Sequence, residues 1–233
     1  MPLALVVLLA TALSYPLGLL LGGGIALPVL NTAAAYAAMV VLLRRGDRRG
    51  AVVLMLAWAA TLAVCATTTF ALWPGDPGPM IVNGPAYRDE MFHWIRTGEG
   101  TESQPRLFIP QHTLHLAAFV LLSLATASVV SIFMGAVLMN YMDFYVASLA
   151  RAGAPAWAVV FLGWQPWAIA RVAAFSVLGV VLAPPLLRRL GVAVPKMRVR
   201  PLVVAAGAAL LADVVLKTAL APLWGQWLRA LLP

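Results

Sequence analysis

Long apolar stretches alternate with short polar intervals along the whole chain. A helix that crosses the hydrocarbon core of a bilayer needs about 20 consecutive apolar residues. The stretches that meet this length are residues 3–21, 25–43, 51–73, 113–131, 133–150, 167–187 and 201–221. The pattern therefore predicts an all-α, polytopic transmembrane helical bundle of about seven spans, formed as one integral membrane domain over residues 1–233.

The number of spans depends on how the second half of the chain is threaded. Residues 113–150 and 155–187 are each too long for one simple crossing, so six or eight spans are the alternatives to seven. Three crossings between residues 113 and 187 place the basic run at 188–200 on the same side as the first basic cluster. Residues 155–165 then become a re-entrant or interfacial segment, and the interruption from Gly163 to Pro166 is typical of a broken helix or of an interfacial turn.

Residues 74–111 form the only long polar interval, and they hold five of the eight acidic residues. Loops of this length are usually functional or disordered. Apolar residues recur within it at helical spacing, Pro85 suits a first helical turn, and Gly98 suits a stop. We therefore expect a structured loop with a short amphipathic helix at about 85–97. Beyond residue 221 we expect a short amphipathic tail that carries Trp224, Trp227 and Arg229.

Composition agrees with a membrane protein and gives it an orientation. Hydrophobic residues make up 63% of the chain and charged residues 10%, which one soluble core of this size cannot accommodate. The net charge of +8 comes largely from two clusters between apolar stretches, which is typical of cytoplasmic loops in contact with anionic lipid and not of nucleic-acid binding. The clusters are Arg44, Arg45, Arg48 and Arg49, and Arg188, Arg189, Lys196, Arg198 and Arg200.

The first apolar run has no basic residues before it and no evident cleavage site, so it predicts a retained first helix and not a cleaved signal peptide. With the basic clusters in the cytoplasm, the N-terminus is also cytoplasmic and the 74–111 loop is extracytoplasmic. We expect the membrane to be a bacterial inner membrane, and the partners to be the lipid bilayer and other membrane-protein subunits.

All three histidines lie in or just after the polar loop, and two pairs of residues have helical spacing. Glu90 and His93 share a face of the predicted loop helix, and His112 and His115 share a face at the start of the next span. Together they could bind a divalent transition metal (Zn, Cu, Fe or Mn), with Asp89 as a second-shell partner. The alternative is ordinary interface structure, because short E-x-x-H and H-x-x-H patterns arise often by chance.

A second set of candidates consists of charged residues inside apolar spans. Asp213 and Lys217 lie one helical turn apart, so we expect a mutual ion pair. Asp143 is a plausible partner for Arg171 or for Lys217. A charge at mid-membrane costs about 2.5–3.5 kcal/mol on insertion scales, so such residues are usually paired or functional. They indicate either a structural ion-pair network or a transport or proton pathway.

No nucleotide-binding, redox or nucleophile-elbow motif occurs in the chain. The weak catalytic inventory favours a non-enzymatic membrane protein, either a subunit of a larger assembly or a small transporter. The alternative is a membrane-embedded metalloenzyme, with Glu90, His93, His112 and His115 as ligands at the outer face, which acts on a lipid or another membrane-accessible substrate.

Overall fold

A computed structural model describes residues 2–196 and 198–232. These residues form nine α-helices and one short 3-10 helix, and they contain no strand. The elements are α1 (Pro2–Leu20), α2 (Ala26–Arg44), α3 (Arg48–Leu72), η1 (Gly78–Met80), α4 (Gly84–Thr97), α5 (Pro105–Thr126), α6 (Val129–Arg151), α7 (Ala156–Leu162), α8 (Pro166–Arg189) and α9 (Arg200–Leu231).

Seven of these helices are long and apolar enough to cross a membrane, namely α1, α2, α3, α5, α6, α8 and α9. Many of their large apolar side chains are exposed on the outside of the bundle, where lipid replaces water. The prediction of an all-α bundle with seven spans is confirmed, and the chain is an integral membrane protein in contact with lipid.

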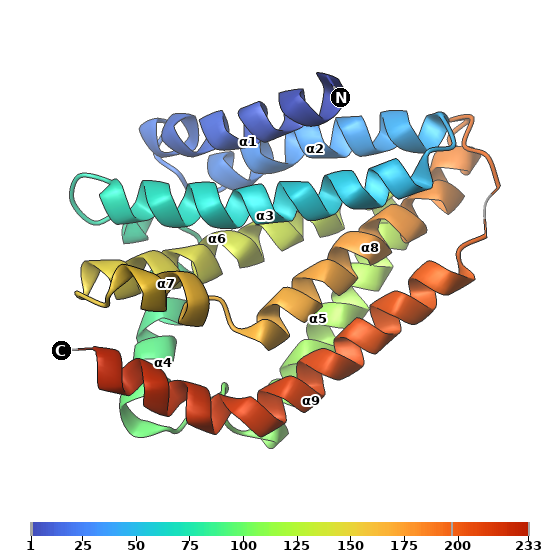
Figure 1. Ribbon diagram of the computed structural model, residues 1–233. Helices are drawn as coiled ribbons and strands as arrows, with labels where there is room; N and C mark the ends of the chain where they lie inside the picture. Colours follow the sequence, from blue (N-terminus) through green and yellow to red (C-terminus); the bar gives the residue numbers. More distant parts are fainter. Residues whose placement is uncertain (1, 197, 233) are drawn as a thin grey trace.

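The helices run between two ends of different composition (Figure 1). The basic end contains the α2–α3 turn, the α5–α6 turn and the α8–α9 connection, and therefore both arginine clusters. The opposite end, called here the α4 end, contains the α1–α2 turn, η1, α4, α7 and the C-terminal turns of α9. The charge asymmetry expected for a protein with a fixed orientation is therefore present between the two ends.

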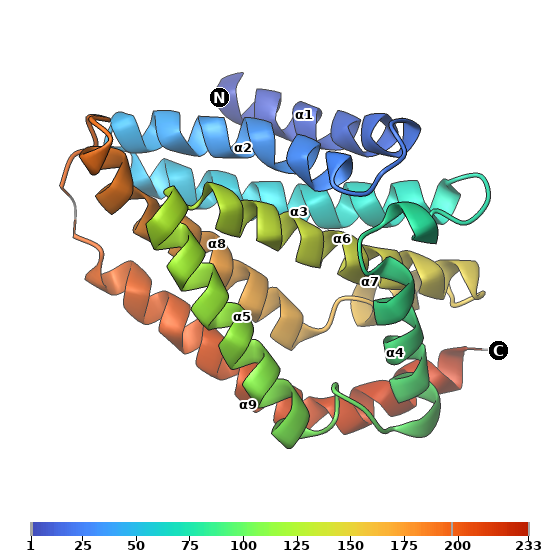
Figure 2. The ribbon, with the colours of Figure 1, turned by 180° about the vertical axis from the view of Figure 1, so that it is seen from behind.

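Two groups of helices make up the bundle. Helices α1, α2 and α3 pack against one another, and α6 packs across α2 and α3. Helices α5, α8 and α9 form a second group, inclined to the first, and α8 joins the two because it packs on both α9 and α3 (Figure 1). Seen from behind, α5 and α6 start from their shared turn at the basic end and diverge toward the α4 end (Figure 2).

Local sequence explains the turns that set this arrangement. The α1–α2 reversal has three successive glycines with positive φ, and a side chain at Gly23 would collide with the carbonyl of Met80. Asp47 caps α3 by accepting a hydrogen bond from the backbone of Gly50 at 2.7 Å. The glycine turn also holds η1 over the end of the first helical pair, because the backbone N–H of Gly24 donates to the carbonyl of Met80 at 2.7 Å.

The predicted loop helix is confirmed as α4. It ends at Gly98, whose φ of 79° is the left-handed conformation that glycine adopts without strain. Its apolar face is buried against α6 and α9 through Met91, Trp94 and Ile95, and its polar face is exposed. The helix thus lies over the α4 end of the bundle and connects its two groups.

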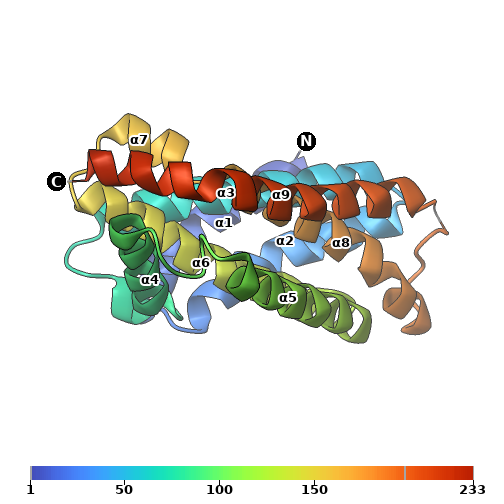
Figure 3. The ribbon, with the colours of Figure 1, turned by 90° about the horizontal axis from the view of Figure 1, so that it is seen from below.

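Three expected boundaries are wrong. Helix α5 begins at Pro105 and not at residue 113, so the loop between α3 and α5 is shorter than 74–111. The α5–α6 turn lies at Ala127 and Ser128, both with positive φ, and not near residue 132. There is no separate C-terminal tail, since α9 continues without a break to Leu231 and runs beneath the bundle from the basic end to α4 (Figure 3). Helices α5 and α9 continue through proline at positions 105, 110 and 222, since proline is tolerated in a first turn and in membrane helices.

Candidate functional site

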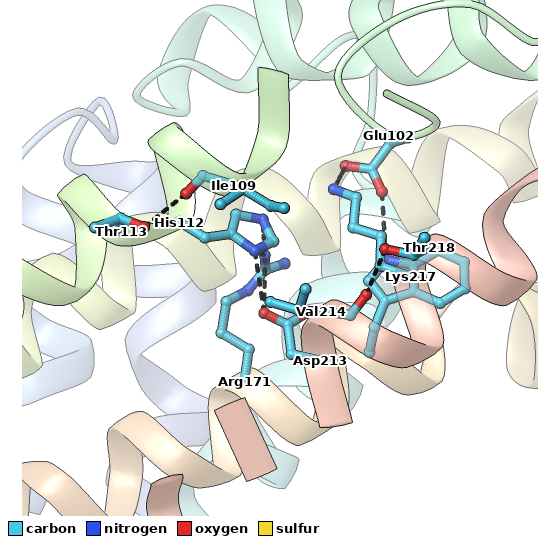
Figure 4. A network of polar contacts seen from close by, with 10 residues as sticks. Glu102, Ile109, His112, Thr113, Arg171, Asp213, Val214, Lys217 and Thr218 are labelled. Atoms are coloured by element: carbon cyan, nitrogen blue, oxygen red, sulfur yellow. Dashed lines mark hydrogen bonds and ion pairs between the residues drawn. The ribbon is translucent and has the colours of Figure 1, made fainter. Parts of the chain in front are cut away.

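Five ionisable side chains form a charge network where α5, α8 and α9 meet beneath the loop from residue 98 to 104 (Figure 4). They are Glu102, His112, Arg171, Asp213 and Lys217. Asp213 and Lys217 lie one turn apart on α9, and both side chains point inward from it. The network has two parts, because each of these two residues is paired with a different element.

The first part is the ion pair between Lys217 and Glu102. The Lys217 Nζ atom lies 2.8 Å from the Glu102 Oε1 atom, and only 1% of the Lys217 side chain is exposed. The other carboxylate oxygen of Glu102 accepts a hydrogen bond from the indole of Trp167 at 3.3 Å. The ammonium also lies 4.7 Å from the centre of the Phe108 ring. The loop after α4 therefore supplies the anion that makes a lysine tolerable inside α9.

The second part joins three helices through His112. Its Nδ1 atom lies 3.1 Å from Asp213 Oδ2, and the guanidinium of Arg171 contacts the same imidazole and lies 3.8 Å from Asp213 Oδ2. Arginine has no acceptor, so this geometry assigns the Nδ1 proton to the bond with Asp213 and leaves Nε2 to accept from Arg171. Asp213 thereby orients His112 and balances the charge of Arg171.

The charges of the network sum to zero when His112 is neutral. Glu102 and Asp213 are balanced by Arg171 and Lys217, and each acid has a basic partner within 4.0 Å. Protonation of His112 adds one positive charge. It also removes the only acceptor that the imidazole offers to Arg171, because an imidazolium has two donors and no acceptor. His112 is therefore the group through which this network can change its state.

A cavity of about 80 Å³ lies beside the network, between α3, α5, α6 and α8. Its rim at the α4 end includes Glu90 and Gln111, and its wall includes His112, His115 and Arg171. Polar groups line the half of the cavity near the α4 end, and mainly apolar groups line the other half.

The apolar half reaches deep into the bundle. It includes Met55, which lies seven residues from the start of α3 at the basic end, or about 10 Å along the helix axis. Phe119 and Phe175 stack there with their ring centres 4.7 Å apart, and Ile132 lies beside them. The cavity therefore extends from the α4 end past the middle of the bundle, and an aromatic pair lies at its deep end.

Two groups of α4 have shifted pKa values that bear on this rim. Burial raises the pKa of Tyr87, which lines the cavity, well above its usual 10.0, so its phenol stays neutral at physiological pH. The pKa of Arg88 is raised by its hydrogen bond to Asp89, at 2.8 Å, and by the charges of Asp89 and Asp76. Arg88 therefore remains a cation that is already paired, and it lies outside the cavity.

The structure brings three of the four predicted metal ligands to one cavity and leaves His93 and the second-shell candidate Asp89 outside it. His112 is in the network, and His115 and Glu90 line the cavity, whereas His93 is exposed on α4 and Asp89 pairs with Arg88. Within residues 2–196 and 198–232, no group of three or more His, Cys, Asp or Glu side chains is placed to hold a metal ion. The metal site stays a prediction from spacing.

Two predicted ion pairs are wrong. Asp213 and Lys217 do not pair with each other, because the first binds His112 and Arg171 and the second binds Glu102. Asp143 pairs with neither Arg171 nor Lys217, since α6 turns it toward α1 and α3, and both of its carboxylate oxygens lack a hydrogen-bond partner. Spacing along one helix does not reveal which neighbouring helix supplies a closer partner.

Glu102 is the functional candidate that sequence reasoning missed. It lies in a polar loop, where an acidic residue is usually solvated, yet it is buried. Charge balance was the available signal. Asp213 cannot neutralise both Arg171 and Lys217, so a second acid was needed within reach of α9.

Comparison of this chain with models of known families, with curated proteins and with solved structures finds no match.

Proposed function

We propose that this protein is a small transporter of a bacterial inner membrane, and that its cavity takes a small anion that carries a carboxylate or phosphate group. The basic end lies in the cytoplasm under the positive-inside rule, so the N-terminus is cytoplasmic and the α4 end faces out. The observation that carries the proposal is the charge network in the wall of a cavity that extends past the middle of a membrane-embedded bundle.

Arginine at the cavity wall sets the sign of the solute. Arg171 uses one nitrogen for His112 and Asp213, so the rest of its planar fork is available to a ligand. His115 lines the same half of the cavity. The unused N–H groups of Arg171 can donate to an anion although Asp213 balances the charge of Arg171, and such hydrogen bonds are stronger where water is scarce.

His112 couples anion binding to a proton. When it is protonated it stops accepting from Arg171, and the network gains one positive charge. The charged groups around it are Asp213 and Lys217 on α9 and Arg171 on α8. Anion uptake therefore increases as the pH on the α4 side falls.

The aromatic pair at the deep end closes the path on the cytoplasmic side. Phe119 is on α5 and Phe175 is on α8, so a change in the angle between these two helices separates the rings. Transporters move substrates by such rocking of one helix group against another around a central site.

Uptake by reconstituted protein tests the proposal. Proteoliposomes are given radiolabelled succinate or inorganic phosphate, which do not cross a lipid bilayer at neutral pH. We expect uptake of at least one anion above that of protein-free liposomes, and its loss in Arg171→Met. The control is Thr218→Ala, because Thr218 is exposed and its hydroxyl bonds only to Val214 of its own helix. Uptake of neither anion by the wild type would refute the proposal.

A subunit role in a larger assembly stays a prediction, and no contact of the described residues bears on it. The metalloenzyme alternative likewise has no supporting geometry within the described residues.

A further inference from the structure

Asp143 is an acidic side chain in the interior of the first helical group, apart from the cavity. It is fully buried, and neither of its carboxylate oxygens has a hydrogen-bond partner. Met139 and Met142 of the same helix line the cavity, whereas Asn140 bonds to α1 and α2. Asp143 is not among the residues that line the cavity, and its titratable neighbours are Tyr15 on α1 and Cys65 on α3, so it faces the first helical group.

A chain of uncharged hydrogen bonds leads from this level toward the basic end. Tyr15 donates to Asn140 at 3.0 Å, Asn140 donates to Asn31 at 2.9 Å, and Asn31 donates to Ser14 at 2.6 Å. Ser14 in turn donates to the carbonyl of Thr11, one turn nearer the start of α1. Polar groups therefore continue from the neighbourhood of Asp143 to the middle of α1.

A cleft of about 410 Å³ lies at the α4 end, and its α6 lining begins at the residue that follows Asp143 in the helix. Phe144 and Ser148 of α6 line it, with charged residues from the loop and α4 around them. The ring of Phe144 is almost fully buried, and it packs edge-on against Phe70 at 6.2 Å. Phe144 therefore lies between the cleft and the residues of the bundle interior.

An ionised carboxylate without a partner is very costly inside a membrane protein. The titratable side chains that face Asp143 from packed helices are Tyr15 on α1 and Cys65 on α3, and neither supplies a positive charge. The charged residues of the cleft are Asp76, Arg88, Asp89, Arg96 and Arg151. A metal cation that neutralised Asp143 would need room and several oxygen ligands. A proton needs neither, so protonation is the simpler way to neutralise this carboxylate.

We propose that Asp143 is a proton-binding site of the bundle, which exchanges its proton with the α4-end cleft when Phe144 moves. The placement of an unpartnered carboxyl between a charged cleft and an internal polar chain carries this inference. It does not depend on which solute the cavity takes. The site gives the protein a second protonatable group at membrane depth, separate from the network of His112.

Infrared spectroscopy of the full-length protein in lipid tests both parts of the proposal. The difference spectrum between the wild type and Asp143→Asn isolates the C=O stretch of Asp143. At neutral pH we expect the band of a protonated carboxylic acid, which shifts to lower frequency when the buffer is changed to D₂O. The matched control is Asp213→Asn, whose difference spectrum should show an ionised carboxylate, because Asp213 is paired with Arg171.

The role of Phe144 is tested by the rate of that shift. Truncation in Phe144→Ala removes packing over the site, so we expect deuterium exchange at Asp143 to become about tenfold faster. Phe144→Leu keeps more of the packing, and the same exchange rate is measured in this variant if Phe144→Ala does not fold. Phe161→Ala, at an exposed position of α7, should leave the rate unchanged.

A carboxylate band for Asp143 at neutral pH would overturn proton binding. A protonated band that never shifts in D₂O would overturn exchange, and a rate unaffected by both Phe144 variants would overturn the route through the cleft.

Discussion

The two helical groups hold themselves together with different polar chemistry. In α1, α2, α3 and α6 the buried polar contacts are neutral, and they link Tyr15, Asn31 and Asn140 across three helices. In α5, α8 and α9 they are ion pairs, built around Asp213 and Lys217. Helices of both groups border the cavity, yet only the polar network of the second group has members in its wall, whereas Tyr15, Asn31 and Asn140 do not line it.

The two kinds of polar contact differ in what they cost the fold. Neutral hydrogen bonds between membrane helices contribute about 0.6 kcal/mol on average and carry no penalty for a net charge. Buried ion pairs have a large desolvation cost, and apolar packing could replace them with little loss of stability. Two such pairs beside a cavity are therefore the feature on which the proposed function rests.

Breaking one ion pair should have the largest effect on stability. Lys217→Met leaves Glu102 buried beside Trp167 without its cation, and we expect the free energy of unfolding to fall by about 3–5 kcal/mol. The measurement is unfolding in mixed micelles followed by tryptophan fluorescence. The double variant Lys217→Met with Glu102→Gln should recover most of the loss. Additive losses would mean that the two side chains are not coupled.

Removal of the charge that orients His112 should have a smaller effect. Asp213→Asn keeps the shape of the side chain but weakens charge-assisted contacts to His112 and Arg171, so we expect a loss of about 2 kcal/mol. The same unfolding assay measures it, with Thr218→Ala as the control on the same helix. A loss no larger than that of the control would show that Asp213 has no energetic role in the network.

A break in the neutral chain should cost less again. Asn140→Leu removes the partner of both Tyr15 and Asn31, and we expect a loss of about 1 kcal/mol, since these bonds are weak in membranes. The control is Thr61→Ala, whose hydroxyl bonds only to Ala57 on its own helix. A loss as large as that of Lys217→Met would contradict the distinction between the two groups.

The smallest effect on the free energy of unfolding is expected from Tyr87→Phe, and it appears only at alkaline pH. Burial raises the pKa of Tyr87 above its ordinary 10.0, so the neutral phenol stabilises the fold below pH 10.0, and this stability is lost as the pH rises toward the folded-state pKa. Tyr87→Phe should match the wild type near neutral pH within about 0.5 kcal/mol and become the more stable protein above pH 10.0. Unfolding measured across this pH range checks the sign. Wild type and variant that respond identically to alkali would contradict a shifted pKa.

Much of the fold was predictable because membrane helices are specified locally. A span must satisfy its backbone hydrogen bonds within itself and present apolar side chains to lipid, so length and hydropathy alone locate it. The loop helix was also predictable, since Pro85 and Gly98 mark its ends and its apolar residues repeat at helical spacing. Its boundaries agree with the prediction to within one residue, whereas those of α5, which has a proline within it, differ by several residues.

The candidate site was predictable only in part. His112, Arg171, Asp213 and Lys217 stand out as polar residues in or beside apolar runs, and all four belong to the charge network. Which of them pair could not be predicted from spacing along the chain. Asp213 and Lys217 lie one turn apart on α9, yet each pairs with a residue of another element. Glu102 gave no local sign of burial.

The sequence by itself determined the class of the molecule, the seven spans, the excess of basic residues at one end and the rare polar residues within it. Each of these follows from the cost of placing a charge or an open backbone in lipid, which acts residue by residue. Only the tertiary structure decided which acid meets which base, which face of α6 carries Asp143, and where the cavity lies. Those outcomes depend on how the helices incline and rotate against one another, and that is set by packing between residues far apart in the chain.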